Sequence, residues 1–585
     1  MGMLRRRLCW ATLLLVLLVA RAGLAGPTRH VPSEDYPTIQ SAIDAAEDGD
    51  VVLVADGTYY EHDLDFQGKA ITVASENGPD NCIVDCEGLG RGFLFHRGEG
   101  ADSVLRGFTI TRGDPTLVGW DDRDADEAAD EDDAEGDWWE GWDEDWWDDA
   151  GWWDGADPDW ADDWWGDWWG DWDGDWWDEG DGDGDWWEDG ADDGADEGHE
   201  ADAGAGWGGG IFCDGASPTL IANVVIGNTA HFGAGIACRD AAPILVGNTL
   251  CGNAAYVFGG GIACSSSSPL ISGNTIAGNA VDSAARRGNE ADDPADDDWW
   301  QDGDEPNDRW EPMGGGGIYC QDSSPTISGN AITHNAADYG GGIACDGFSS
   351  PTLSGNTITR NTAAYCGGGV ACINSSPTLR GNVVAGNAAG EGHADEETRE
   401  GCGGGIYCES ASATLANNTL SGNTAAGSGG ALFAAAGSSV TLTNSVLWGD
   451  SAPHGPEIAL HDDSSVAVTY SDVQGGASAV RAAEGSSAQW GVGNLDADPL
   501  FAGPGHRDYH VKSAGGRYDP SRGRPPSDPA AWVTDSVHSP CIDAGDPIFD
   551  CSAEPGSNGG RINVGAFGNT PEASRAAPAR AGSGH

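Results

Sequence analysis

The sequence predicts an all-β protein: a right-handed parallel β-helix solenoid with an N-terminal helical cap, a disordered acidic Asp/Trp-rich insert and a C-terminal closing module. Two observations predict the solenoid. Asparagine recurs about every 26 residues, and aliphatic residues keep a fixed phase to it over more than 200 residues. These apolar segments are too short for helices, whereas strands of about three to five residues between Gly and Asn corners fit the spacing.

The repeat is anchored on one asparagine: Asn223, Asn248, Asn274, Asn330, Asn356, Asn382, Asn418 and Asn444. An aliphatic residue lies three positions before it, as in Leu220, Leu245, Ile271, Ile327, Leu353, Leu379 and Leu415. Another lies two positions after it, as in Val225, Leu250, Ile276, Ile332, Ile358, Val384 and Leu420. No single coil can bury these residues, so we expect coils to stack about 4.8 Å apart, each strand pairing with its equivalents above and below.

A second asparagine follows the first by five residues: Asn228, Asn253, Asn279, Asn335, Asn361, Asn387 and Asn423. Asparagine tolerates left-handed backbone, and its side chain can bond the corner of the neighbouring coil. We therefore expect both asparagines to mark corners. A third strand reads Gly-Gly-Gly-Ile-x-Cys, as at 208–213, so that each coil has three short strands.

Seven cysteines share one inward position of successive coils: Cys213, Cys238, Cys264, Cys320, Cys345, Cys372 and Cys408. Such a line of thiols is not a tetrahedron, which argues against a metal site. Parallel side chains about 4.8 Å apart also miss the Cβ separation of a disulfide. We expect a ladder of buried thiols instead.

The two ends have their own patterns. Arg5 to Arg7, the apolar run 13–20 and the small residues up to Ala25 predict a signal peptide over 1–25. The spacing of Ile39 and Ile43 predicts a short amphipathic helix that caps the first coil, followed by a strand at 51–54. The expected domains are the cap and first coils at 31–113, the repeats at 207–480, a closing module at 494–571 and a disordered tail at 572–585.

The repeats Gly-Gly-Gly-Ile-Ala-Cys and Ser-Pro-Thr-Leu-Ser-Gly-Asn-Thr-Ile resemble those of bacterial right-handed β-helix proteins of the pectate-lyase-like superfamily. Segments 498–501 and 563–568 resemble the closing module common after such β-helices. The resemblance covers about residues 31–571 apart from the inserts. It implies the fold but no activity, because no segment matches the lyase motifs or the hydrolase pattern of the superfamily.

Three acidic inserts interrupt the repeats, at 114–206, 282–313 and 390–401. Each enters after the second corner and leaves before the Gly-rich strand, so we expect all three on one side of the solenoid. The first holds most of the 26 Trp of the chain, and Arg123 is its sole basic residue. Its charge density and monotony predict disorder. The alternative is a polyanion that collects divalent cations and stacks Trp on sugars.

Calcium is the cation that these carboxylates suit, because hard cations prefer several oxygen ligands. Two triplets match the first three positions of a calcium loop but have Trp at position six: Asp171, Asp173, Asp175 and Asp181, Asp183, Asp185. Asp322 and Asp346, on adjacent coils, are a further candidate cation site. Arg360 and Arg380 also lie on regular coils, and the resemblance implies an Arg or Lys base on one sheet face of the lyases.

Three cysteine pairs are disulfide candidates: Cys82 with Cys86, Cys366 with Cys402, and Cys541 with Cys551. The second pair is expected at equivalent corners of adjacent coils. These pairings presuppose export into an oxidising compartment.

The net charge of −69 makes nucleic acid an improbable partner, because phosphates would be repelled. We expect a secreted or cell-surface monomer, without a transmembrane segment in the mature chain, that is non-catalytic and binds a polysaccharide or the cell envelope. The alternatives are a polysaccharide lyase or hydrolase acting on acidic polysaccharide, and a surface adhesin. Nucleophile, phosphate-loop and dinucleotide signatures are absent from the sequence.

Overall fold

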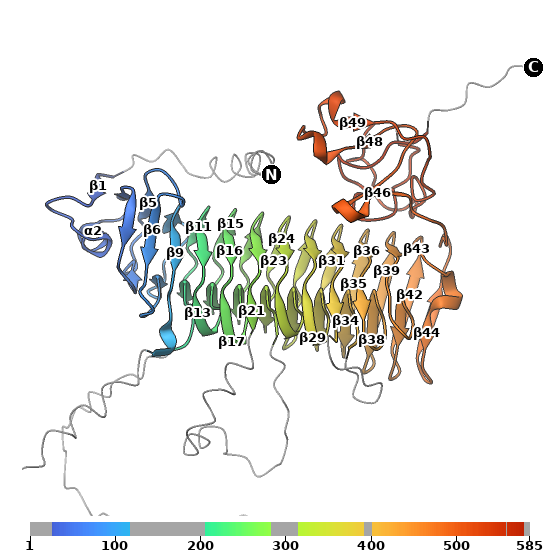
Figure 1. Ribbon diagram of the computed structural model, residues 1–585, viewed down its shortest axis with the longest axis horizontal. Coiled ribbons are helices and arrows are strands. Elements are labelled where there is room, and N and C mark those ends of the chain that lie inside the picture. Colours follow the sequence, from blue (N-terminus) through green and yellow to red (C-terminus); the bar gives the residue numbers. More distant parts are fainter. Residues whose placement is uncertain (1–25, 118–204, 282–313, 391–400, 557, 578–585) are drawn as a thin grey trace, which may run out of the picture. The chain divides into compact units, whose positions relative to one another are not determined.

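The computed structural model describes residues 26–117, 205–281, 314–390, 401–556 and 558–577, which belong to one compact unit. Its strands stack from β1 to β45 as successive coils (Figure 1). From β1 to β45 the strands pair in parallel with their equivalents in neighbouring coils, as Ile211 does with Ile236 and Cys213 with Cys238. The predicted parallel β-helix is therefore confirmed.

Four parallel sheets run along the described part of the solenoid. Sheet I contains β1 (Thr28–Val31), β2 (Val51–Val54), β5 (Thr72–Ser75), β8 (Val104–Arg106), β11 (Thr219–Ile221), β15 (Ile244–Val246), β19 (Leu270–Ser272), β23 (Thr326–Ser328), β27 (Thr352–Ser354), β31 (Thr378–Arg380), β35 (Ser412–Ala416), β39 (Ser439–Thr443), β42 (Ser465–Thr469) and β45 (Ser487–Trp490). Sheet II contains β3 (Gly57–Tyr59), β6 (Cys82–Asp85), β9 (Thr109–Thr111), β12 (Val224–Ile226), β16 (Thr249–Cys251), β20 (Thr275–Ala277), β24 (Ala331–Thr333), β28 (Thr357–Thr359), β32 (Val383–Ala385), β36 (Thr419–Ser421), β40 (Val446–Trp448) and β43 (Asp472–Val473).

Sheet III contains β13 (Thr229–Phe232), β17 (Ala254–Phe258), β21 (Ala280–Val281), β25 (Ala336–Tyr339), β29 (Thr362–Cys366), β33 (Ala388–Ala389) and β37 (Thr424–Ala425). Sheet IV contains β4 (Leu64–Asp65), β7 (Phe93–Phe95), β10 (Ile211–Asp214), β14 (Ile236–Arg239), β18 (Ile262–Ser265), β22 (Ile318–Gln321), β26 (Ile343–Asp346), β30 (Val370–Ile373), β34 (Ile406–Glu409), β38 (Leu432–Ala435), β41 (Ile458–Leu460) and β44 (Arg481–Ala482).

The main core fills the interior of the coils. All the in-phase Leu, Ile and Val residues of the repeat have exposed fractions of 0%, and the seven in-line cysteines of 0–1%. The predicted inward faces and the buried thiol ladder are thus confirmed. Apolar burial of this kind stabilises a fold by roughly 25 cal/mol per Å² of surface removed from water.

Sheet III corrects the expectation of three strands per coil. After the second asparagine, Thr- and Ala-rich segments pair with one another, as Thr229 does with Ala254 and Ala230 with Ala255. Ala230 and Ala255 are fully buried in a small cluster of their own. The sequence concealed this strand because alanine supplies no strong apolar signal.

The gaps in the description fall where the inserts were expected. They lie between Leu117 and Ala205, between Val281 and Gly314, and between Gly390 and Gly401. The second and third follow sheet III strands directly, each gap precedes a sheet IV strand, and η1 (Pro115–Leu117) contacts β13. The chain therefore departs from one side of the solenoid in all three places.

Two buried asparagine ladders join the coils. Asn248 Nδ2 donates to Leu220 O of the preceding coil at 2.9 Å and to Asn274 Oδ1 of the next at 3.1 Å. Asn248 Oδ1 accepts from the backbone N of Asn223 at 3.0 Å. The same pattern runs from Asn228 to Asn423 in the second ladder. Every amide atom of an interior rung is therefore satisfied, as burial requires.

Asn444 is not a rung of the first ladder, contrary to the sequence alignment. Thr419 pairs with Val446, so the residue equivalent to Asn418 is Ser445, whose Oγ accepts from Asn418 N at 3.0 Å. The last step is therefore 27 residues. Asn444 lies one position earlier, where its Oδ1 accepts from Asp546 N at 2.7 Å and so holds the closing module.

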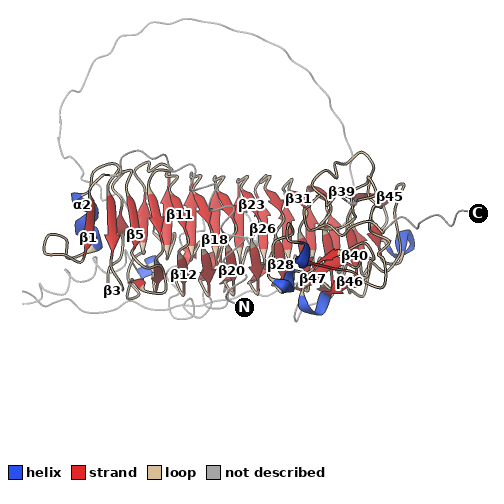
Figure 2. Ribbon diagram, turned by 90° about the horizontal axis from the view of Figure 1, so that it is seen from above, coloured by secondary structure: helices blue, strands red, loops and turns tan. Residues whose placement is uncertain are grey.

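The N-terminal cap is confirmed. Helix α2 (Ile39–Ala45) buries Ile39, Ala42 and Ile43, and Thr38 caps its first turn by accepting from Ser41 N. It contacts β1, β2 and β4, so its apolar face covers the open end of the first coils. Figure 2 shows α2 at one end of the stacked strands.

The closing module covers the outer face of sheet II near β32, β36 and β40, where Val383 and Val446 pack against Tyr509 and Ile542. It contains two antiparallel pairs, β46 (Phe501–Gly503) with β47 (Asp508–Val511) and β48 (Arg517–Tyr518) with β49 (Trp532–Val533).

The predicted disordered tail is wrong for residues 572–577. Ser574 Oγ donates to Val511 O at 2.6 Å, and Arg575 lies over the Trp532 ring at 3.8 Å. Ala573 is fully buried. Polar composition concealed this packing, because the contacts are made with residues about 40–60 positions earlier. Residues 578–585 lie outside the description.

Asp450 ends the second ladder. Its Oδ1 accepts from Asn423 N and Nδ2, both at 2.7 Å, as an asparagine would. Its Oδ2 is buried without a hydrogen-bond partner, as is Glu457 Oε2. Burial and the nearby Glu457 raise the pKa of Asp450 well above its ordinary value.

We expect Asn387→Asp to lower the free energy of unfolding by about 2–4 kcal/mol. Asn387 Nδ2 donates to Ile358 O and Asn423 Oδ1, and a carboxylate there would face both acceptors with a buried charge. Urea unfolding measures the loss. Thr352→Asp, on an exposed position of β27, adds the same charge as a control. Equal losses for the two variants would contradict a structural role for the ladder.

We expect Asp450→Asn to stabilise the protein at pH 7 by about 1–2 kcal/mol, because an amide can donate to Glu457 where the carboxyl group needs a proton. The folded-state pKa of Asp450 is raised, so its contribution is fully present below about pH 4 and is lost as pH rises. Between pH 4 and 8, the melting temperature of the wild type should therefore fall more than that of the variant. An equal change in melting temperature for the two proteins over this range would contradict the assignment.

Candidate functional site

A cleft of about 280 Å³ lies where the closing module meets sheet II. One wall is the corner that follows β28, β32 and β36 on three successive coils, and the other is the segment from η4 (Pro504–His506) to Tyr509. Its lining is Thr359, Arg360, Ala385, Gly386, Ser421, Gly422, Pro504, Gly505, Arg507 and Tyr509. This lining contains two arginines and no carboxylate.

The corner after sheet II requires left-handed backbone. Its φ is between 57° and 79° in the coils from β12 to β40, and glycine occupies it in most of them: Gly227, Gly252, Gly278, Gly386, Gly422 and Gly449. His334 and Arg360 are the exceptions, at φ 58° and 57°. A side chain in this conformation costs about 1 kcal/mol or more. Two adjacent coils therefore carry nitrogen-bearing side chains where the backbone favours glycine.

Arg360, Arg507 and His334 lie close enough to influence one another. Burial, then the positive charge of Arg360, lowers the pKa of Arg507. Burial, then Arg507 and Arg360, lowers the pKa of His334 and favours its neutral form. Among the described residues, neither arginine has an ion pair with a carboxylate. The fold thus brings two like charges together without a counter-ion, in a strongly acidic chain.

Arg112 shows what the same corner does elsewhere. It occupies the position equivalent to Gly227, at φ 56°, and bonds Asp85 Oδ1 at 2.6 Å. That ion pair accounts for it structurally. Arg360 instead extends over the next coil, with its Cγ 4.0 Å from where a Cβ on Gly386 would lie. Arg380 has a different neighbour: its Cζ atom lies 5.9 Å from the centroid of the Phe549 ring.

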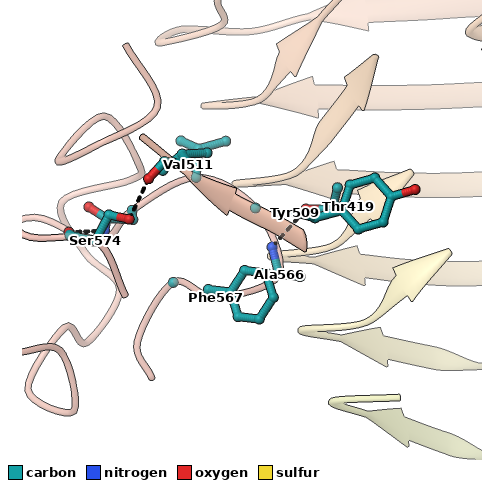
Figure 3. Close-up of a pocket in the computed structure, with 10 residues that line it drawn as sticks. Thr419, Tyr509, Val511, Ala566, Phe567 and Ser574 are labelled. Carbon is teal, nitrogen blue, oxygen red and sulfur yellow. Dashed lines mark hydrogen bonds between the residues drawn. The ribbon is translucent and has the colours of Figure 1, made fainter. Parts of the chain in front are cut away.

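The cleft wall at Tyr509 is held by the seam between module and solenoid. Ala566 N donates to Thr419 Oγ1 at 3.0 Å, and Ser574 Oγ donates to Val511 O (Figure 3). The space inside this seam is about 10 Å³, no larger than one water molecule, so the seam is a packed contact. Burial raises the pKa of Tyr509, which keeps its hydroxyl protonated.

Of the predicted cation sites, the described residues include the pair Asp322 and Asp346. The triplets Asp171, Asp173, Asp175 and Asp181, Asp183, Asp185 lie outside them. Asp322 and Asp346 lie on adjacent coils but out of register, because Gln321 pairs with Asp346. Asp346 Oδ1 accepts from Gly347 N at 2.7 Å, and no group of three or more His, Cys, Asp or Glu able to hold a metal occurs in the described chain. Burial, and to a smaller extent the charge of Asp322, raises the pKa of Asp346, so the two carboxyl groups lie near each other and a cation site there stays a prediction.

The structure places the three predicted disulfide pairs differently. Cys82 begins β6 and Cys86 follows its end, so about 13 Å of extended strand separates their Cα atoms and this pairing is wrong. Cys541 Sγ instead donates to Asp472 Oδ2 at 3.1 Å, and its pairing with Cys551 stays a prediction. Cys366 and Cys402 do lie on adjacent coils, since Gly367 N donates to Cys402 O at 3.0 Å.

Arg360 was recognised from the sequence as a residue of a regular coil, whereas His334, Arg507 and Tyr509 were not predicted to join it in one site. A usable signal for His334 was present, since it replaces glycine at a repeated position. No signal linked Arg507 to the repeats, because it lies about 150 residues away from Arg360 in the chain. No helix in the described residues has the length and apolar character needed to cross a membrane.

Comparisons with known proteins agree with this architecture. Residues 209–447 match the family model described as right handed beta helix region, and residues 404–545 match one described as disaggregatase related. The solenoid wall of the cleft at Arg360 lies in the first match, and the wall at Arg507 lies in the second. No curated protein matches the chain.

The solved structures that are similar to this chain include a pectate lyase and an alginate lyase. The pectate lyase is 12% identical, covering 93% of this chain and 96% of its own, with a TM-score of 0.37. The alginate lyase is 10% identical, covering 79% of this chain and 53% of its own, with a TM-score of 0.32. The right handed beta helix match and the parallel, in-register sheets establish the fold. Residues 209–447 are thus similar to right handed beta helix regions, and the described chain folds as a parallel β-helix.

Proposed function

We propose that the protein is an exported, non-catalytic β-helix that binds a carboxylate-bearing polysaccharide in the cleft between Arg360 and Arg507. The observation that carries the proposal is the convergence of these two arginines without a carboxylate partner in the described chain. Guanidinium groups bind carboxylates through paired, charge-assisted hydrogen bonds, and such a ligand would remove the repulsion between them.

The size and composition of the cleft support a short stretch of sugar rings. Its volume of about 280 Å³ is near the lower end of small-molecule sites, which are roughly 300–1,000 Å³. Thr359, Ser421 and the glycine corners supply small polar and open surfaces along the solenoid axis. The wall at Gly422 is unobstructed, since a Cβ there would meet nothing within 4 Å. A chain of sugars could therefore continue past the arginines.

The strongly negative net charge sharpens this proposal. The chain has a net charge of −69, so an anionic ligand would bind only where positive charge is concentrated. Export and a cell-envelope location follow from the signal-like N-terminus as expectations of the sequence. They belong to the same proposal, because acidic polysaccharides are extracellular polymers.

We expect Arg360→Gly to weaken binding of an oligogalacturonate by about 10- to 100-fold, the value of one charge-assisted pair. Glycine suits the φ of 57° at this corner, so the variant should fold at least as well as the wild type. Isothermal titration in chelator measures the affinity. Arg112→Gly, the same substitution at the equivalent corner, should leave it unchanged. An equal effect of both variants, or equal binding of a neutral glucose oligomer, would contradict the proposal.

A specific observation favours a second function, a lyase acting on the same class of polysaccharide. The lowered pKa of His334 supplies a neutral imidazole beside two arginines. Elimination from a uronate needs a base for the proton next to the carboxylate and positive charge to stabilise the anion that forms. His334 and Arg360 lie on adjacent coils, with His334 N donating to Thr359 O at 3.3 Å.

If this second function holds, oligouronates will gain unsaturated ends, seen as ultraviolet absorbance, and His334→Gly will lower the rate at least 100-fold. Because the base form is needed, the rate should fall as pH drops through the pKa of His334, which lies below 6.5. Arg112→Gly is again the control. If no oligouronate gains unsaturated ends between pH 5 and 9, the lyase function is contradicted and the binding function alone remains.

A further inference from the structure

Cys366 and Cys402 contact each other on the outer side of the main core. Cys366 is the last residue of β29, and Cys402 precedes the glycines that lead into β34. Their exposed fractions are 2% and 4%. They belong to a second apolar cluster, with Ala371 and Tyr407, packed on the outward face of sheet IV. Burial, then a hydrogen bond with the Cys402 thiol, raises the pKa of the Cys366 thiol.

Side chains at this position touch from coil to coil. In the early coils it carries Trp207, Phe232 and Phe258, which pair in register. Their successive ring centroids are 4.6 Å apart at both steps. Tyr339 occupies the position in the coil before Cys366. Two thiols here therefore replace a stacked aromatic contact with one that can become covalent.

The local backbone suits a covalent bond better than the inward cysteine ladder does. Cys345 and Cys372 lie within regular strands in strict register, where parallel Cβ atoms stay about 4.8 Å apart and a disulfide needs about 3.8 Å. The pairing of β25 with β29 instead shifts register just before Cys366. Cys402 belongs to no strand. Each of the two cysteines is followed by a glycine in left-handed backbone, Gly367 at φ 73° and Gly403 at φ 67°, so both lie next to a corner and not in the middle of a strand.

We propose that Cys366 and Cys402 form a disulfide bond in the presence of a disulfide oxidant. Each thiol loses its proton, and the two electrons released as the S–S bond forms reduce a small-molecule disulfide, such as oxidised glutathione, to two thiols. The bond fixes the place where the chain returns at Gly401, whose N donates to Tyr365 O at 3.0 Å. It closes a loop that includes residues 391–400, which stabilises the fold by restricting the unfolded chain.

The test is to equilibrate the full chain in a glutathione redox buffer, quench with acid, alkylate under denaturing conditions and map the peptides by mass spectrometry. We expect a peptide pair joined through Cys366 and Cys402, with Cys345 and Cys372 alkylated. The oxidised protein should melt several degrees higher than the reduced protein. Cys402→Ser should abolish this difference, whereas Cys251→Ser, at a partly exposed position of β16, should retain it.

Either of two results would overturn the proposal in the wild-type protein, whatever the variants do. The first is complete alkylation of Cys366 and Cys402 after equilibration in oxidising buffer. The second is their joining to other cysteines of the chain. Neither outcome depends on ligand binding in the cleft, so the disulfide and the proposed function stand or fall separately.

Discussion

The buried amide ladders are the constraint on which the structure depends. Each interior asparagine accepts from the coil before it and donates to the coils on both sides, so removing one leaves polar groups buried without partners. This geometry fixes both the stacking distance and the sharp corners. The apolar core supplies most of the burial, but the ladders determine where the chain turns and therefore which residues face inward.

The ladders also determine where function can develop. Each corner lies outside the core, repeats at the coil spacing and favours glycine because of its positive φ. A side chain there is costly to the fold and needs a compensating role. Arg112 has one in its ion pair with Asp85, whereas Arg360 and His334 face the closing module and Arg507. The cleft thus forms where two coils carry large side chains in place of the corner glycine and where the closing module covers them.

Much of the fold followed from the repeat, since in-phase Leu, Ile and Val can be buried together only by stacking coils. The errors have different causes. Asn444 was placed by counting residues, and one extra residue in a coil changes which side chains align. Sheet III was missed because alanine gives little signal, and the packed segment 572–577 because its partners are remote in sequence.

The sequence by itself determined the solenoid, its capped start, the inward thiols and the side from which the inserts depart. All of these arise from local periodicity, which a chain expresses wherever it folds. Only the tertiary structure decided that Arg360 meets Arg507. The physical reason is that this contact depends on the docking of the closing module against the coils, which no local pattern encodes.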